Sequence, residues 1–277
     1  MVPELPEVET VRRALVPALE GSTIREVEVG HERMLRRQPR PRDFIDRLIG
    51  REVKAIGRHG KFLFTELEGD LTWVTHLGMS GRVRLVLPGE DPVPHTHVVV
   101  IADREVDLHF VDPRTFGFMA VFTPDELASQ PFAQLGPDAL TNLPRFPQLI
   151  PRLSGRRSPI KSVLLDQRFL AGLGNIYADE VLHRSHIRPH RLAGSLTSDE
   201  VRELRNAIKP VLEAGLRWGG TSLNDLAYLL PDGRAGEYLN RLKVYGRESE
   251  PCNRDGTAIQ RSVIGGRSSF WCPTCQK

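Results

Sequence analysis

The sequence predicts an α+β protein of more than one domain: an N-terminal antiparallel β-sandwich with a helix, then a helical domain that ends in a hairpin. Hydrophobic residues alternate with polar ones through much of the first half and recur at helical spacing in the second. A stretch rich in proline and glycine separates the two patterns, as a connector between domains would. The 277 residues, 40% hydrophobic and 26% charged, have globular composition and leave room for two domains.

The first element expected is a helix near the amino end. Pro6 suits a first helical turn, and Val8, Val11 and Leu15 fall on one face before Gly21. Short runs with strand character follow, separated by turns that contain Gly, Asp or Pro. These runs are 62–67, 71–76, 82–87, 97–102, 105–111 and 117–122. Their even spacing predicts an antiparallel sandwich or barrel on which the helix packs.

Helical spacing dominates the second half. Pro159 marks a first helical turn, residues 175–184 resume the helical pattern, and Thr197 with Glu200 forms a capping box before a longer helix. Residues 221–238 show little periodicity and are expected to form a loop. We expect a β-sandwich domain at 1–130, a connector at 131–157, a helical domain at 158–245 and a terminal finger at 246–277.

The two halves of the chain differ in charge. Residues 1–150 carry a net charge of −4 and residues 151–277 a net charge of +7, and 32 of the 38 basic residues are Arg. The arginine guanidinium forms paired hydrogen bonds with phosphate oxygens, so the basic half favours a polyanionic partner. An excess of arginine also follows from coding bias. The acidic start and the lack of a long apolar run argue against a signal peptide or membrane helix, so we expect a cytoplasmic protein.

The three cysteines indicate a metal site. Cys252, Asp255, Cys272 and Cys275 have the spacing of a two-knuckle zinc ribbon, with Asp where the second Cys would stand. Zinc prefers thiolate to carboxylate, so this set should hold the metal less tightly than four thiolates. The alternative is a hairpin that keeps the shape and has lost or loosened the metal.

Three further segments could bind or react, although each has an ordinary structural explanation. Gly172 and Gly174 precede Asn175 at a helix start, where backbone N–H groups attract an anion, but glycine before a helix is also a common turn. Arg267 would lie on the hairpin, against a phosphate or simply in solvent. Pro3 next to an acid near the terminus could serve as an amine nucleophile, or could simply begin the helix.

Six separated motifs, taken together, resemble one family over essentially the whole chain. They are PELPEVET, HGKF around Lys61, THLGMSG around Met79, DPRTFG around Arg114, LLDQRFLAGLGNIYADE, and VYGRE before the cysteines. In this order they are similar to formamidopyrimidine-DNA glycosylases (Fpg, MutM). The sister endonuclease VIII type opens with a sequence that resembles PEGPE, so PELPEVET fits the Fpg branch better.

The resemblance implies a DNA repair enzyme that flips an oxidised purine, such as 8-oxoguanine or a formamidopyrimidine, out of duplex DNA. It would cleave the glycosidic bond and then nick the strand as an AP lyase, by β,δ-elimination. The implied fold is a β-sandwich, a helix-two-turn-helix domain with a loop over the lesion, and a zinc finger. The implied partner is double-stranded DNA in the nucleoid, bound by a monomer, with one structural Zn²⁺ per chain.

The resemblance also assigns roles to individual residues. The catalytic residues would be Pro3, Glu4 and Lys61; the DNA-binding residues His76, Met79, Arg114, Phe116, Asn175, Tyr177 and Arg267; the pocket acids Glu7 and Glu180; and the zinc ligands Cys252, Asp255, Cys272 and Cys275. Within the DNA-binding set, Met79, Arg114 and Phe116 would fill the gap left by the flipped base. Lys61, His76, Asn175 and Arg267 would grip phosphates.

Two residues depart from the family pattern. Asp255 replaces a cysteine, and Val2 stands between Met1 and the proline whose free amine is the family's nucleophile. With Val2 in place the Pro3 nitrogen is an amide and cannot attack. Three alternatives therefore stay open: a catalytically silent lesion-binding protein of this fold, an endonuclease VIII-like glycosylase for oxidised pyrimidines, and a general zinc-ribbon DNA-binding factor.

Overall fold

The chain folds into two compact units in the computed structural model, which describes residues 3–222 and 228–277. The first unit combines Met1–Gln134 with Trp218–Leu239, and the second combines Leu135–Arg217 with Asn240–Lys277. Residues 218–239 thus fold with the first unit, whereas the sequence placed them in the helical domain at 158–245. Within the described residues, no helix is long and apolar enough to cross a membrane.

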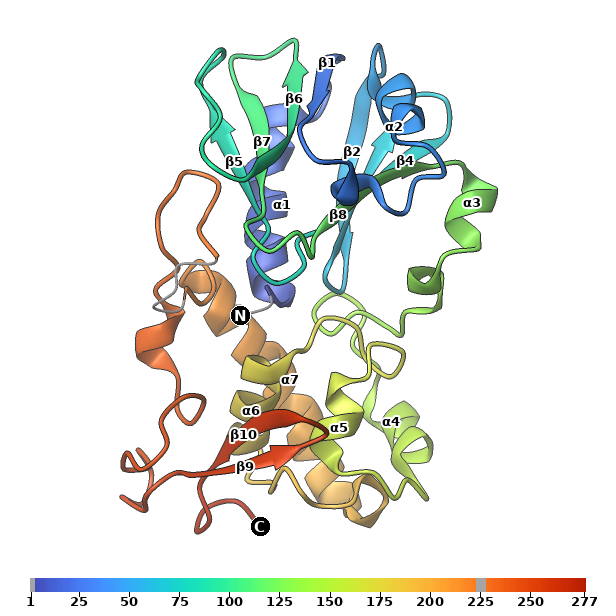
Figure 1. Ribbon diagram of the computed structural model, residues 1–277. Helices are drawn as coiled ribbons and strands as arrows, with labels where there is room; N and C mark the ends of the chain where they lie inside the picture. The colour runs from blue at the N-terminus through green and yellow to red at the C-terminus, as the bar shows by residue number, and fades with distance from the viewer. Residues whose placement is uncertain (1–2, 223–227) are drawn as a thin grey trace. The chain divides into compact units, whose positions relative to one another are not determined.

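Two four-stranded antiparallel sheets build the first unit (Figure 1). One sheet has the order β1-β6-β7-β5 and the other the order β2-β3-β4-β8. The strands are β1 (Ile24–Val29), β2 (Val53–His59), β3 (Phe62–Leu67), β4 (Leu71–His76), β5 (Arg82–Val86), β6 (Thr96–Ala102), β7 (Asp107–Val111) and β8 (Phe118–Phe122). The expected antiparallel β-sandwich is therefore confirmed, and β1 and β2 are strands that the sequence reading did not identify.

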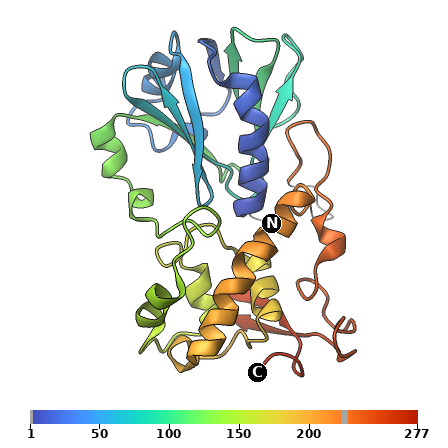
Figure 2. The ribbon, with the colours of Figure 1, turned by 180° about the vertical axis from the view of Figure 1, so that it is seen from behind.

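The helix α1 (Leu5–Leu19) packs against β2 and β3, and Figure 2 shows it in front of the sheets. Its buried face contains Val8, Val11 and Leu15, the residues that shared a face in the sequence. These side chains join residues of both sheets in one hydrophobic core. The other elements of this part of the chain are η1 (Glu32–Leu35), α2 (Pro41–Leu48), α3 (Pro124–Ala128) and η2 (Pro131–Gln134).

Residues 218–239 belong to the first unit because they complete its core and one sheet edge. Tyr228 is fully buried in the same hydrophobic core as α1. The N–H of Leu85 on β5 donates to the carbonyl oxygen of Pro231 at 3.1 Å. These contacts are tertiary, so the weak periodicity of the segment gave no sign of them. The lesion loop expected at 221–238 falls partly on residues 223–227, which lie outside the described residues.

The second unit is helical and carries the expected hairpin. Its elements are α4 (Phe146–Leu153), α5 (Ile160–Leu165), α6 (Asn175–Arg184), η3 (Ala193–Ser195), α7 (Ser198–Arg217), the hairpin strands β9 (Gln260–Ile264) and β10 (Arg267–Trp271), and η4 (Tyr238–Arg241), which joins the two units along the chain. The capping box before α7 is confirmed, since Thr197 N–H donates to Glu200 Oε2 at 2.8 Å. The stretch read as a connector contains a helix, α4, whose first turn holds Pro147.

Candidate functional site

The amino end of α1 places Pro3, Glu4 and Glu7 together. Glu4 is the residue before the helix and is 2% exposed, and its N–H donates to Glu7 Oε2 at 2.9 Å. The other oxygen of Glu7 accepts the N–H of Thr221 at 2.7 Å. Both carboxylate oxygens of Glu7 therefore accept hydrogen bonds from backbone N–H groups. Glu7 fixes the orientation of Glu4 and joins the start of α1 to the 218–239 segment.

Gly220 sits against that carboxylate. It has a φ of +81°, and a Cβ at this position would lie 2.7 Å from Glu7 Oε1. Only glycine adopts this backbone conformation without strain and also leaves room for the acid. The arrangement makes Glu7 a buried anchor beside Glu4.

Lys61 and His76 lie at neighbouring strand ends of the second sheet. Lys61 lies in the turn between β2 and β3, and Phe62 next to it pairs with His76 at the end of β4. Burial, together with the charges of Lys61, Arg36 and Arg37, lowers the pKa of His76 to about 4. The ring is therefore neutral at pH 7. Its Nδ1 accepts the N–H of Gly78 at 3.1 Å, which places the ring proton on Nε2.

Met79, Arg114 and Phe116 lie on two loops that Asp112 holds together. The buried carboxylate of Asp112 accepts the hydroxyl of Ser80 at 2.5 Å and the N–H of Gly117 at 2.7 Å. It also accepts the N–H of Arg114 at 3.3 Å. The sequence reading did not identify Asp112, and the Asp-Pro turn in DPRTFG was the available signal.

The tip of the loop that carries Arg114 and Phe116 is exposed, and Met79 on the other loop is partly buried. Phe116 is 42% exposed, and the Arg114 guanidinium lies 5.1 Å from the centre of its ring. The carbonyl oxygens of Phe116 and Gly117 both accept from Arg36. Gly78 approaches the same segment so closely that a Cβ on it would lie 2.3 Å from the nitrogen of Gly117. The backbone of the loops is thus held from several sides while the aromatic tip faces solvent.

In the second unit, the sequence-predicted residues on α6 occupy different environments. Asn175 starts the helix, and its Nδ2 donates to the carbonyl oxygen of Ser268 on β10 at 3.0 Å. Tyr177 is fully buried, and a Cβ on Gly215 of α7 would lie 2.4 Å from its hydroxyl. The Tyr177 side chain therefore packs in the core between α6 and α7, and the DNA-binding role of this residue stays a prediction.

Glu180 is a backbone anchor like Glu7. Its Oε1 accepts the N–H groups of Val244 and Tyr245 at 2.9 and 3.0 Å, and the N–H of Lys243 lies 2.9 Å from Oε2. Glu180 is buried, so these donors replace the water that a carboxylate would otherwise bind. The acid fixes the chain that leads into the cysteine segment.

Arg267 begins β10, directly after the Gly265–Gly266 turn. Both glycines have positive φ, 55° and 77°, and Arg267 pairs with Ile264 across the turn. A two-residue turn with both central residues at positive φ matches the twist of a hairpin, which explains the Gly-Gly pair. The exposed Arg267 side chain is thereby placed at the tip of the hairpin.

The four expected zinc ligands converge. One donor atom from each of Cys252, Asp255, Cys272 and Cys275 lies within 4.8 Å of the others. The sulfurs of Cys252 and Cys275 are 3.9 Å apart, and Cys272 Sγ is 3.4 Å from Asp255 Oδ2. A tetrahedral zinc with Zn–S bonds of ~2.3 Å separates its sulfur ligands by about 3.8 Å, so the donor set fits the ion.

The surroundings of the cysteines contain a histidine from a distant part of the chain. His183 Nε2 on α6 lies 3.6 Å from Cys252 Sγ, although 69 residues separate the two in the chain. The contact arises because β10 packs against α6.

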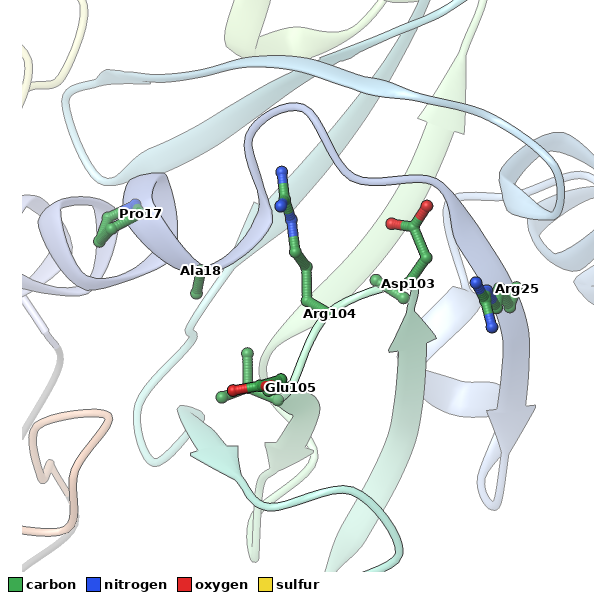
Figure 3. Close-up of a pocket in the computed structure, with 8 residues that line it drawn as sticks. Pro17, Ala18, Arg25, Asp103, Arg104 and Glu105 are labelled. Carbon is green, nitrogen blue, oxygen red and sulfur yellow. The ribbon is translucent and has the colours of Figure 1, made fainter.

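A pocket of about 840 Å³ lies elsewhere in the first unit, beside the end of α1 (Figure 3). Arg25, Asp103, Arg104 and Glu105 supply its charged groups. Asp103 accepts the N–H of Thr23 at 2.7 Å, and Arg104 donates to the carbonyl oxygen of Glu20 at 3.1 Å. These two side chains hold loops of the first unit, and none of the sequence-predicted site residues lines the pocket.

Comparison with known proteins matches three family profiles to successive parts of the chain. The formamidopyrimidine-DNA glycosylase N-terminal domain matches residues 2–119, and the H2TH domain of the same glycosylases matches residues 135–226. The zinc finger found in FPG and IleRS matches residues 249–277. The zinc-finger match and the converging ligands together assign the cysteine cluster to zinc.

Relatives match over the full length. Formamidopyrimidine-DNA glycosylase from Pelotomaculum thermopropionicum is 42% identical over 277 residues, which cover 100% of this chain and 99% of that protein. The same enzyme from Desulforamulus reducens is 43% identical over 279 residues, with 100% and 99% covered.

Solved structures agree with the relatives. MutM (Fpg) from Thermus thermophilus aligns with a TM-score of 0.88 at 40% identity, covering 99% of this chain and 98% of that one. A Lactococcus lactis Fpg mutant in complex with a Fapy-dG containing DNA aligns with a TM-score of 0.90 at 32% identity, covering 99% and 100%. Fold and site thus define a DNA repair glycosylase with a zinc finger. The chain belongs to the formamidopyrimidine-DNA glycosylase family.

Proposed function

We propose that this protein is a bifunctional enzyme that removes 8-oxoguanine and formamidopyrimidines from duplex DNA and then cleaves the strand at the abasic site. Its relatives carry the glycosylase name, and Lactococcus lactis Fpg has been solved with Fapy-dG and abasic-site containing DNA, and MutM with carbocyclic 8-oxo-G containing DNA. Those titles describe the relatives and support the substrate class proposed here. We further propose that the enzyme acts as a monomer.

The proposed nucleophile is the amine of Pro3 in protein from which Met1 and Val2 have been removed, since Pro3 is otherwise an amide. A terminal amine has a pKa of about 8, so a usable fraction is neutral at pH 7. Its nitrogen bonds to C1′ of the damaged nucleotide, and the base leaves with the electrons of the glycosidic bond. The resulting iminium permits loss of a C2′ proton and expulsion of the 3′ phosphate, followed by δ-elimination of the 5′ phosphate and hydrolytic release of Pro3.

Glu4 is proposed to protonate the sugar oxygen as the ring opens. Its position supports this role because Glu7 binds the Glu4 N–H and fixes that residue at the helix start. In this proposal Glu7 and Glu180 support the site by holding its backbone in place. Both hold backbone segments through their carboxylates.

The proposed DNA grip uses residues from both units. Lys61 and Arg267 supply cations, and neutral His76 supplies the Nε2 proton to a phosphate oxygen. The Asn175 amide nitrogen carries two hydrogens, of which one binds Ser268 and the other would bind a phosphate. The wedge would be Phe116 in the base stack, with Arg114 and Met79 filling the gap left by the flipped base.

One observation supports the proposal more than any other: the exposed Phe116 ring stands on a loop that buried Asp112 holds in place. An exposed aromatic on a fixed loop is suited to insertion between bases. If the Phe116 ring served the hydrophobic core, it would be buried. If its loop were flexible, insertion of the ring would cost more conformational entropy than it does from a loop that is already fixed.

Covalent trapping tests the proposed chemistry. Protein whose mass shows that it begins at Pro3 is mixed with an 8-oxoguanine duplex and borohydride, and the adduct is mapped by peptide mass spectrometry. We expect a stable DNA adduct on Pro3, which Glu4→Gln abolishes without loss of binding, while exposed Glu66→Gln on β3 leaves it unchanged.

The Val2 residue favours one competing function, a silent lesion-binding protein. Binding of 8-oxoguanine DNA with no adduct from protein that begins at Pro3 would establish it and exclude the enzyme. The same assay is carried out in parallel on a duplex that contains an oxidised pyrimidine. Faster base removal from that duplex would contradict the purine assignment.

A further inference from the structure

The C-terminal segment that carries the cysteines and the hairpin, residues 252–275, contacts α6 at its start, its middle and its end. At its start, Asn175 donates to the carbonyl oxygen of Ser268 on β10. In the middle, Asp179 accepts the N–H of Phe270 at 2.9 Å. At its end, His183 reaches Cys252. Figure 1 shows the hairpin alongside α6.

His183 meets the zinc site at a sulfur. Its Nε2 lies 3.6 Å from Cys252 Sγ, and both side chains are buried. A thiolate bound to zinc has no proton and can only accept hydrogen bonds. In the zinc-loaded protein, the N–H of His183 must therefore be the donor in this contact.

Arg254 makes a second contact of the same kind. Its Nη1 lies 3.7 Å from Cys275 Sγ and donates to the carbonyl oxygen of His183 at 2.7 Å. Its Nη2 donates to the carbonyl oxygen of Arg184 at 3.3 Å. These carbonyls end α6, so the guanidinium caps the negative end of the helix while it touches a zinc ligand.

The third sulfur takes a backbone donor, since Cys275 N–H lies 3.4 Å from Cys272 Sγ. Each of the three thiolates therefore has at least one N–H group directed at it. Zinc with three thiolates and a carboxylate carries a formal charge of −2, and Asp255 is an exposed oxygen ligand with a weaker preference for zinc.

We propose that His183 and Arg254 are hydrogen-bond donors that stabilise the zinc-bound thiolates of Cys252 and Cys275 and so keep zinc in a site whose fourth ligand is Asp255. The donors withdraw negative charge from the sulfurs, which disfavours their protonation and the loss of the metal. The groups around a metal's ligands commonly change metal affinity by about 10- to 100-fold. The same donors tie the metal site to the helix that begins at Asn175.

The test measures zinc release from the full, zinc-loaded protein to the chelator 4-(2-pyridylazo)resorcinol. His183→Phe removes the donor and keeps a ring, and Arg254→Met removes the charge and keeps the stem. We expect release about tenfold faster in each variant. His183→Gln places an amide N–H near the same position and should restore slow release.

His190→Phe is the matched control. The His190 ring lies 5.4 Å from the Trp271 ring on the same hairpin, and its release rate should equal that of the parent protein. Circular dichroism verifies that each variant is folded before the measurement. Release unchanged in both His183→Phe and Arg254→Met overturns the proposal.

Cobalt substitution gives a readout that does not depend on release. Loss of a hydrogen bond to a bound thiolate raises the energy of its electrons, so the sulfur-to-cobalt charge-transfer band should move to longer wavelength in both donor variants. An unchanged band contradicts the proposal. Imidazole scattering in X-ray absorption that disappears in His183→Phe would make His183 a direct ligand and would also overturn it.

Discussion

Asp112 accepts a 2.5 Å hydrogen bond from the hydroxyl of Ser80, and this contact joins the loop that carries Met79 to the loop that carries Arg114 and Phe116. The same carboxylate binds backbone N–H groups of the second loop. Because Asp112 is fully buried, loss of its acceptors leaves those groups without water to replace them.

Asp112→Asn should disturb both stability and base removal. The side-chain amide of Asn would place N–H groups where hydrogen-bond donors already point at the Asp112 carboxylate. We therefore expect a loss of about 1–3 kcal/mol in the free energy of unfolding. Urea unfolding and single-turnover removal of 8-oxoguanine measure the two effects. Asp103→Asn, which alters an acid in another loop of the same unit, should leave base removal unchanged.

Phe116→Ala should leave stability nearly unchanged and impair base removal. The ring is largely exposed, so its truncation should change the free energy of unfolding by no more than about 0.5 kcal/mol. Stacking of a base on an aromatic is worth about 1–3 kcal/mol, so removal of the lesion should slow by roughly ten- to a hundredfold. Leu87→Ala, at a 71% exposed residue, provides the comparison; equal rates for the two variants would contradict the wedge role.

His76 should make the protein less stable as the pH falls below neutral. Its pKa is about 4 in the folded protein and about 6.5 unfolded, so only the unfolded chain takes up the proton between these values. The stabilisation is fully present above about pH 6.5 and is lost as the pH falls towards 4. His76→Asn keeps an acceptor for the Gly78 N–H and should flatten this part of the stability profile, measured by urea unfolding. A variant profile that parallels the parent's would refute the assignment.

DNA binding should respond to salt through the cations alone. If Lys61 and Arg267 each neutralise one phosphate, together they contribute about −1.8 to the log–log slope of affinity against salt, and Lys61→Ala or Arg267→Ala should reduce its magnitude by about 0.9 each. Neutral His76 releases no counterion, so His76→Asn should weaken binding with the slope unchanged. Fluorescence anisotropy titrations at several salt concentrations measure the slopes, and a slope unaffected by Lys61→Ala would remove Lys61 from the phosphate grip.

Asp255→Cys should slow zinc release, because a fourth thiolate is a better ligand for zinc than a carboxylate. Asp255→Ala should accelerate it, since the metal then keeps only three protein ligands. Chelator competition measures both variants, with one zinc per chain expected at the start. Release from Asp255→Ala at the parent rate would show that Asp255 is not a ligand.

The sequence predicted the elements whose signals are local. The capping box at Thr197 and the apolar face of α1 depend on residues within a few positions of each other, and the zinc cluster depends on a fixed cysteine spacing. Strand β1 was missed because acidic residues interrupt its hydrophobic pattern.

Long-range contacts account for the features that the sequence could not predict. Glu7 and Glu180 were found as acids, but Glu7 binds the N–H of Thr221, 214 residues away, and the backbone partners of Glu180 lie at least 63 residues away. The resemblance assigned Tyr177 to DNA binding, and only the packing of Gly215 against it shows that its side chain lies in the core. The contact between His183 and Cys252 depends in the same way on how the hairpin packs.

The close approach of Gly78 to Gly117 sets the spacing between two tips of the proposed wedge. Met79 and Phe116 are each one residue from this backbone contact, so their separation is fixed by main chain rather than by side-chain packing. Side chains at the tips can therefore change in size or polarity without moving one loop from the other. Under the proposed function, lesion preference would diverge among related proteins by substitution at the tips alone, while a side chain at Gly78 would force the loops apart and alter every tip at once.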